Sequence, residues 1–245
     1  MLPSPNRESS QSMLVTIIIP CCNEVDSLPR LFNELQRLPH LLGPAHFPEL
    51  LLLDDGSTDG TAVVARAWCD RSPFPMRIIG FDANRGLGAM LREAAEFAQG
   101  DALVTYDADL PYPLEDLPAM LAALLAGADV VTASPWHPAG SAQVSWWRAA
   151  LSRTISKLYR LRLGRRAQGL HTFTCGYRVW RAATYRASLP TRDGFVATAE
   201  MLLRALRSGA RAVELPSALR PRLEGVSKLR VLRTACAHLR LLLRG

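Results

Sequence analysis

The sequence lacks the signals of several common protein classes. None of its five cysteines forms a Cys-x-x-Cys pair and their number is odd, so we expect a reducing compartment and no structural zinc. The longest apolar stretch, Leu117 to Val131, contains Gly127 and Asp129 and is too short to span a bilayer. No internal repeat is present. These absences favour a globular protein without a transmembrane helix.

Familiar nucleotide-binding signatures are also missing. The sequence has no Gly-Lys-Ser/Thr phosphate loop, and Gly86-Leu87-Gly88 lacks the full six-residue dinucleotide fingerprint. An ATPase and a nicotinamide-dependent enzyme are therefore disfavoured. A nucleotidyltransferase usually begins with a glycine-rich loop that carries Arg or Lys, and Cys21-Cys22-Asn23-Glu24 is a poor match to that loop.

Length and composition fit one large α/β domain. The chain has 245 residues, of which 49% are apolar and 21% charged, so it can bury a sizeable core. Residues 1–12 are polar and lack the apolar core of a signal peptide. We expect them to form a flexible tail on a cytoplasmic protein that can contact the inner face of the membrane.

Charge is distributed unevenly along the chain. Residues 1–145 hold 8 Arg/Lys and 18 Asp/Glu, a net −10, whereas residues 146–245 hold 21 and 4, a net +17. The acidic part is suited to a metal ion and the basic part to phosphates or an anionic surface. No aromatic-interleaved basic motif is present, so we expect no nucleic-acid partner.

Apolar runs and helical periodicities alternate along the chain. Strands are expected at residues 14–19, 49–53, 76–80, 102–106 and 128–133, and shorter ones at 172–179 and 213–215. Helices are expected from Leu28 to about Pro39, over 62–68, 84–98, 117–126, 148–161, 197–208 and 227–243, with a loop at 40–48. This alternation predicts an α/β fold, a doubly wound and mainly parallel sheet with basic C-terminal helices.

Two aspartates follow the expected strand at residues 102–106. Side chains two apart on an extended chain point the same way, so Asp107 and Asp109 can direct two carboxylates beyond the carboxyl end of this strand. Ligands of open α/β sheets bind at that edge, and a hard divalent ion that holds a diphosphate suits such a pair. The alternative is a turn whose aspartates only cap the helix that follows.

A second acidic turn, Asp54-Asp55-Gly56-Ser57, is expected at the same sheet edge. Glycine relieves a tight backbone there, and an aspartate can accept hydrogen bonds from a base or a ribose. The alternative is an ordinary helix N-cap that uses Ser57 or Thr58.

Three turns in one order, Pro20 to Glu24, Asp54 to Ser57 and Asp107 to Asp109, match a known family. The chain resembles family 2 glycosyltransferases of the GT-A fold, a nucleotide-diphospho-sugar transferase fold, and within them the dolichyl- or polyprenyl-phosphate mannose synthases. The resemblance extends from about Leu14 to at least Lys228. It implies a hexosyltransferase that uses a GDP- or UDP-linked sugar and Mg²⁺ or Mn²⁺.

The resemblance also implies roles for individual residues. The metal ligands are Asp107 and Asp109, and the nucleotide or donor contacts are Pro20, Asn23, Glu24, Asp54, Asp55, Gly86 and Asp107. Arg148, Ser152, Arg178 and Glu200 fall on the acceptor side. Asp109, Arg148, Arg222 and Lys228 are the expected catalytic residues, the last two lying in Arg222-x-x-Gly225-x-Ser227-Lys228. The alternative for Arg222 and Lys228 is a solvated basic surface.

The sequence departs from the family pattern at three places, one of which is His171-Thr172 in place of a common aspartate-proline pair. Pro111 stands where many members have a metal-binding Gln, so water or donor phosphate would complete the metal shell. Ala133-Ser134-Pro135 replaces a common Gly-Ser-Arg, and one acceptor-side arginine is absent. These departures leave the identity of the sugar and of the acceptor open.

The expected reaction is an inverting displacement that moves mannose or another hexose to polyprenyl phosphate. A hydroxyl acceptor is the alternative and would need a general base, for which Asp109 and Glu200 are the candidates. A protein that binds nucleotide sugar without turnover is a further alternative.

We expect a tail at 1–12, a transferase domain at 13–226 and a basic amphipathic helix at 227–245. That helix either lies on an anionic leaflet or packs on the domain.

Overall fold

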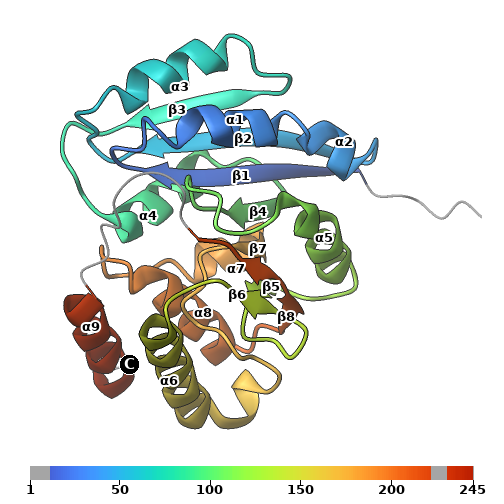
Figure 1. The fold of residues 1–245 in the computed structure, drawn as a ribbon. Coiled ribbons are helices and arrows are strands. Elements are labelled where there is room, and N and C mark those ends of the chain that lie inside the picture. Colours follow the sequence, from blue (N-terminus) through green and yellow to red (C-terminus); the bar gives the residue numbers. More distant parts are fainter. Residues whose placement is uncertain (1–11, 222–230, 245) are drawn as a thin grey trace, which may run out of the picture.

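A seven-stranded sheet runs through the part of the chain that the structure describes, residues 12–221 and 231–244 of a computed structural model (Figure 1). The strand order is β3-β2-β1-β4-β7-β5-β8, and every neighbouring pair is parallel except those of β7, which is antiparallel to β4 and to β5. The strands are β1 (Met13–Cys21), β2 (His46–Asp54), β3 (Met76–Gly80), β4 (Ala102–Thr105), β5 (Val130–Ser134), β7 (Arg178–Arg181) and β8 (Ala212–Pro216). The pair β6 (Ser141–Ala142) and β9 (Ala218–Leu219) forms a second small sheet.

Helices cover both faces of the sheet. One face packs against α1 (Leu28–Leu35), α2 (Leu38–Leu42), α3 (Thr61–Cys69) and α5 (Leu117–Leu125). The other packs against α4 (Leu87–Phe97), α6 (Trp146–Leu163), α7 (Ala182–Ala187), α8 (Ala197–Arg207) and α9 (Val231–Arg244). The 3₁₀ turns Leu114–Asp116 and Gly164–Ala167 join these elements.

Alternation along the central strands explains the two-sided core. In β1, Ile17 and Ile19 face the first set of helices and Ile18 faces the second. In β2, Leu52 and Leu53 divide in the same way. A strand that is buried on both faces needs an unbroken apolar run, which is what the sequence has at both places.

The parallel arrangement brings several turns to one edge of the sheet. Strands β1, β2 and β4 pair in parallel, and β5 runs in the same direction as β4 because both are antiparallel to β7. The turns that follow these strands therefore lie at a common edge. These turns contain Asn23, Asp55, Asp107 and Trp136.

The doubly wound, mainly parallel sheet predicted from the sequence is confirmed, two local predictions are wrong, and one helix was missed. The loop expected at 40–48 contains the end of α2 and the start of β2, since Pro39 stands in the first turn of α2, where a proline is favourable. The strand expected at 172–179 is only Arg178–Arg181, because Thr172 and Thr174 bond to the side chains of Glu214 and Ser152 and not to a neighbouring strand. Helix α7 was not predicted.

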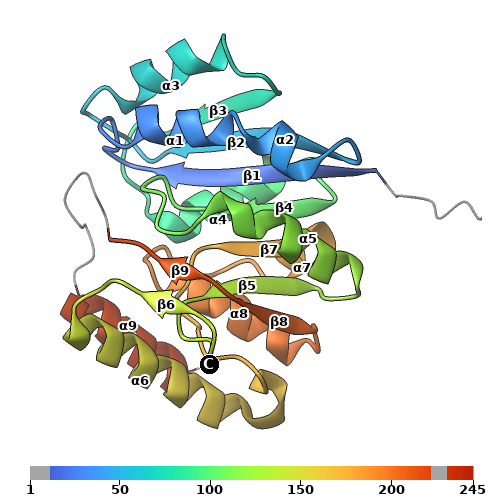
Figure 2. The same ribbon diagram turned by 45° about the vertical axis from the view of Figure 1, so that its right-hand side comes forward.

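The last helix, α9, lies beside α6 in both views (Figures 1 and 2). His238 of α9 is buried, its Nδ1 lies 3.0 Å from the hydroxyl of Tyr159, and Leu241 is buried with it. Leu239 and Leu243 point to solvent. The helix therefore packs on the domain with one side only. Over residues 12–221 and 231–244, no helix is long and apolar enough to cross a membrane.

The division into a tail at 1–12, a domain at 13–226 and a terminal helix at 227–245 stays a prediction. Residues 1–11 and 222–230 lie outside the described part of the chain. The helical character predicted for the C-terminal segment is confirmed from Val231 to Arg244.

Acid should weaken the packing of α9 on α6. Burial lowers the pKa of His238 from an ordinary 6.5 to about 4, so between these values the unfolded chain holds a proton that the folded chain does not. Stability should therefore fall as the pH falls through this window, by about 2 kcal/mol between pH 7 and pH 4.5. Urea unfolding at the two pH values measures the effect.

The matched variant is His238→Gln, which keeps a hydrogen-bonding group for Tyr159 and cannot be protonated. It should show a smaller loss of stability on acidification than the wild type. Equal losses in the two proteins would contradict the assignment to His238.

Candidate active site

The turn after β1 is hydrogen-bonded to the turn after β2 and to the start of α3. Asn23 adopts a left-handed backbone with φ of 50°, and its side-chain oxygen accepts from the backbone N–H of Thr58 at 2.7 Å. Its own N–H donates to Ser57 Oγ at 2.8 Å, and the N–H of Glu24 donates to Thr61 Oγ1 at 2.9 Å. A strained residue that is held from several sides is typical of a ligand-binding turn.

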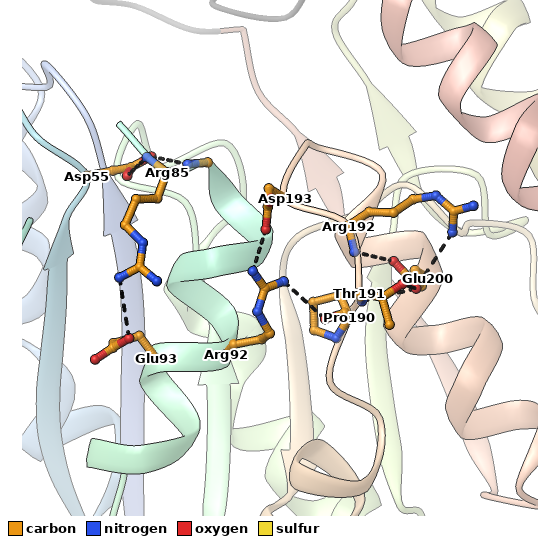
Figure 3. A network of polar contacts seen from close by, with 10 residues as sticks. Asp55, Arg85, Arg92, Glu93, Pro190, Thr191, Arg192, Asp193 and Glu200 are labelled. Carbon is orange, nitrogen blue, oxygen red and sulfur yellow. Dashed lines mark hydrogen bonds and ion pairs between the residues drawn. The ribbon is translucent and has the colours of Figure 1, made fainter. Parts of the chain in front are cut away.

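The carboxylate of Asp55 organises the start of α4. Asp55 is buried and accepts from the backbone N–H groups of Arg85 at 2.6 Å and Gly86 at 2.9 Å (Figure 3). Asp54 is also buried and accepts from the N–H of Ser57 at 3.1 Å, as a cap of its own turn. Both predicted donor residues therefore shape the loops at this edge. Pro20 lies in β1, opposite Leu53 of β2.

Asp107 and Asp109 lie where the sequence predicted, directly beyond β4. Both are partly exposed, whereas Tyr106, Ala108 and Leu110 between and beside them are buried. The strand does not extend this far, since residues 108–109 form a turn, so the two carboxylates lie on a turn beyond β4 and not on the extended segment expected from the sequence. The turn closes with the N–H of Leu110 on the carbonyl of Asp107 at 3.3 Å, and Leu110 has a positive φ of 53°.

The surroundings of the two aspartates fit a hard divalent cation. A Cβ at Gly176 would lie 2.8 Å from one Asp107 oxygen and 3.0 Å from the other, so the absence of a side chain there leaves room for the carboxylate. Among the described residues no cluster of three or more His, Cys, Asp or Glu forms a complete metal site. Two carboxylates with substrate phosphate and water suit Mg²⁺ or Mn²⁺, since Mg²⁺ keeps several waters in proteins.

Asp109 also faces the start of α1. It lines a shallow pocket with Ser27, Arg30 and Leu110. The hydroxyl of Ser27 donates to Glu24 Oε2 at 2.9 Å. The pocket therefore connects the turn after β1 with the turn after β4.

The expected acceptor residue Ser152 belongs to a small polar cluster. Its Oγ accepts from the indole N–H of Trp136 at 3.0 Å and lies 2.9 Å from Thr174 Oγ1. Arg148 is one turn earlier on the same side of α6, exposed, with its guanidinium 5.1 Å from the ring centre of Trp147.

The segment that contains Thr174 runs directly to Asp107. The hydroxyl of Thr105, in β4, donates to the carbonyl of Gly176 at 2.6 Å, and Gly176 lies against the Asp107 carboxylate. Cys175 is buried between them, and burial raises the pKa of its thiol to about 11, so it stays protonated near neutral pH. Residues 174–176 thus link the polar cluster around Ser152 to the Asp107 carboxylate.

Arg178 is held inside the protein. Its guanidinium donates to the carbonyls of Thr198 at 2.5 Å and Phe173 at 2.9 Å. Burial lowers its pKa to about 10, so it remains cationic at neutral pH. These bonds hold Phe173, next to Thr174 of the polar cluster, against α8. The acceptor contact predicted for Arg178 stays a prediction.

Glu200 is buried and holds the loop that precedes α8. Its carboxylate accepts from the backbone N–H groups of Thr191 and Arg192, both at 3.1 Å, and from the Thr191 hydroxyl at 2.6 Å (Figure 3). These contacts give Glu200 a structural role in the described geometry. An acceptor contact by Glu200 also stays a prediction.

The same loop packs against the start of α4. The N–H of Gly88 donates to the carbonyl of Asp193 at 2.8 Å, and a side chain on Gly86 or Gly88 would collide with this loop. Arg92 forms an ion pair with Asp193 as well (Figure 3). The glycines of the sequence motif therefore permit a close approach between α4 and the loop that precedes α8.

Arg222 and Lys228, the two predicted cations that would face the donor phosphates, lie outside the described residues. The described chain reaches Pro221 near the aspartate turn, since the N–H of Arg220 donates to the carbonyl of Pro111 at 2.8 Å. Arg220 was not predicted as a site residue.

Sequence reasoning also missed a carboxylate–imidazole pair. Glu214 of β8 is buried, its Oε1 lies 3.0 Å from Nδ1 of His171, and its Oε2 accepts the N–H of Thr172 at 2.9 Å. The ring of His137 lies edge-on, 6.1 Å from that of His171. A single glutamate in a short strand gives no local signal of such a pair.

Comparison with known proteins identifies the family. Residues 16–186 match the family described as glycosyl transferase family 2. The polyprenol monophosphomannose synthase of Mycolicibacterium smegmatis is 31% identical over 220 residues, covering 87% of this chain and 80% of that protein. The undecaprenyl-phosphate 4-deoxy-4-formamido-L-arabinose transferase of Pseudomonas paraeruginosa is 31% identical over 180 residues, covering 74% of this chain but only 50% of that protein.

A solved structure has the same fold. Glucosyl-3-phosphoglycerate synthase from Mycobacterium tuberculosis, in complex with Mn²⁺, UDP and phosphoglyceric acid, superposes with a TM-score of 0.68 at 17% identity, covering 94% of this chain and 76% of that one. The family match spans most of the chain and carries the turns described above. The chain therefore belongs to glycosyl transferase family 2 and is a glycosyltransferase with the GT-A fold.

Proposed function

We propose that this glycosyltransferase moves a hexose from a GDP- or UDP-sugar to a polyprenyl phosphate, with inversion at the anomeric carbon, at the inner face of the membrane. The observation that carries the proposal is the continuity of the site. Ser152 contacts Thr174, and two residues further Gly176 lies against Asp107. An acceptor phosphate bound near Ser152 would lie next to a donor diphosphate bound at Asp107.

The nucleotide would bind over the turns after β1, β2 and β3. Asn23, Glu24 and Asp55 hold those turns in place, and the first two remain accessible at the surface. Because these hydrogen bonds order the turns before the donor binds, binding costs less conformational entropy.

Asp107 and Asp109 would hold Mg²⁺ or Mn²⁺ against the donor diphosphate. Bound there, the cation supplies Lewis-acid stabilisation of the departing nucleoside diphosphate. The M. tuberculosis relative in fold was crystallised with Mn²⁺ and UDP, which supports this part of the proposal. Arg222 and Lys228 would add positive charge on the same leaving group.

Arg148 and Ser152 would orient the acceptor phosphate for in-line attack. A phosphate oxygen attacks C1 of the sugar while the bond from C1 to the donor diphosphate breaks. Because a phosphate is already anionic near neutral pH, this acceptor needs no strong general base, and orientation supplies much of the rate. The two relatives at 31% identity are named for polyprenol or undecaprenyl-phosphate products, which supports a lipid phosphate.

One observation favours a hydroxyl acceptor instead. Such an acceptor needs a general base, and Glu200 is buried in loop contacts. His171, held at Nδ1 by the buried Glu214, could accept a proton through its other ring nitrogen. Loss of transfer to an alcohol but not to a lipid phosphate in His171→Gln would support this second candidate.

Asp109→Asn should abolish metal-dependent transfer without unfolding the protein. The variant removes one negative charge from the proposed cation site, and we expect at least about a hundredfold lower kcat. The assay follows labelled sugar from a panel of GDP- and UDP-sugars to polyprenyl phosphate in detergent, with Mn²⁺, Mg²⁺ or a chelator.

The matched control is Asp70→Asn at the exposed end of α3, which should behave as the wild type. Full activity of Asp109→Asn, or of the wild type in chelator, would contradict the metal site. A donor that is hydrolysed while no lipid is labelled would contradict the lipid acceptor.

Arg148→Gln should weaken binding of the acceptor and leave the donor unaffected. Loss of one charge-assisted contact to phosphate should raise KM for polyprenyl phosphate about tenfold, while KM for the nucleotide sugar stays constant. Arg66→Gln on α3 is the exposed control. A change confined to the KM for the nucleotide sugar would contradict the assignment of Arg148 to the acceptor site.

A further inference from the structure

Helix α6 exposes four large apolar side chains. Ile155 and Tyr159 face the core, while Trp146 is 81% exposed and Leu161 is 71% exposed. Trp147 and Leu158 are exposed on the same outward side as Leu161, spaced by whole turns. Large exposed side chains that gather on one face mark an interaction surface.

The same helix is surrounded by positive charge. No Asp or Glu occurs between Asp129 and Asp193. The exposed cations of α6 and of the turn after it are Arg148, Arg153, Lys157, Arg160, Arg162, Arg165 and Arg166. In the described part of the chain none of these forms an ion pair with a carboxylate.

The neighbouring helices extend this surface. On α9, Leu239 is 48% exposed and Leu243 is 85% exposed, with the exposed Arg240 beside them. Both views show α9 alongside α6 (Figures 1 and 2). On α8, burial and the charges of Arg162 and Arg166 lower the pKa of Arg207, a sign that cations crowd one another here.

We propose that the outward face of α6, with α9 beside it, docks on an anionic lipid bilayer. Apolar and tryptophan side chains would enter the interface, and the flanking Arg and Lys side chains would contact anionic headgroups. Nucleic acid would match the charge but not the exposed Trp and Leu side chains. The choice of a lipid surface rests on the proposed function. It adds to that function the surface of the protein that would contact the membrane.

The docking geometry explains how the acceptor would reach the site. The inner side of α6 carries Ser152, which is bonded to Trp136 and Thr174. A helix is only about 10 Å across, so a helix lying in the interface places its inner side close to the headgroups. A lipid phosphate could then enter the acceptor cluster without leaving the bilayer.

Vesicle co-sedimentation of the full chain, without donor, metal or polyprenyl phosphate, tests the proposal. Wild-type protein should bind phosphatidylcholine vesicles containing phosphatidylglycerol at least tenfold more tightly than vesicles of phosphatidylcholine alone. The double variant Trp146→Ser/Leu161→Ser should bind about tenfold more weakly, as should Lys157→Gln/Arg160→Gln. The controls are Val63→Ser and Arg66→Gln, exposed positions of α3 on the other face of the sheet.

Two results would overturn the docking surface. Equal vesicle binding by the wild type, the α6 variants and the controls would show that α6 does not contact the bilayer. Weaker binding by the charge variant alone would indicate a general polyanion surface instead of a bilayer interface.

Transfer to polyprenyl phosphate in detergent separates this proposal from the function. The α6 variants should retain that activity and lose only vesicle binding. Transfer without vesicle binding would reject the docking surface and keep the function. Vesicle binding that depends on α6, with no lipid phosphate labelled, would support the surface and reject the acceptor.

Discussion

Two carboxylates at the end of β4 set the main constraint on this protein. Asp107 and Asp109 stand two residues apart at this turn, and neighbouring like charges favour a bound cation or a positive side chain nearby. Tyr106 and Ala108 anchor the turn in the core, so the pair cannot separate easily. In the proposed site, the nucleotide would bind on one side of this point and the acceptor phosphate, near Ser152, on the other.

The two sides are joined by backbone contacts that exclude side chains. Gly176 makes room for Asp107, and Gly86 and Gly88 let α4 approach the loop before α8. Glu200 and Asp55 hold the two ends of that contact through backbone N–H groups. Buried carboxylates bonded in this way position loops, whereas Asp107 and Asp109 are only partly buried.

The sequence predicted what depends on local pattern. The apolar runs of β1 and β2, the position of Asp107 and Asp109 beyond a strand, and the family of the chain are all confirmed. It did not predict the contacts of Ser152 with Trp136 and Thr174, because these depend on how distant segments pack. Residues 172–177 have the sequence pattern of a strand. The N–H of Thr172 bonds instead to the side chain of Glu214, a contact with a distant segment that the local pattern does not reveal.

The linkage in the product tests the central claim most directly. A nuclear magnetic resonance spectrum of the purified glycolipid reports both whether the anomeric proton couples to phosphorus and which anomer is formed. We expect coupling to one phosphorus and a configuration opposite to that of the nucleotide sugar. An anomeric proton without phosphorus coupling would place the sugar on a hydroxyl group, and a retained configuration would contradict direct displacement.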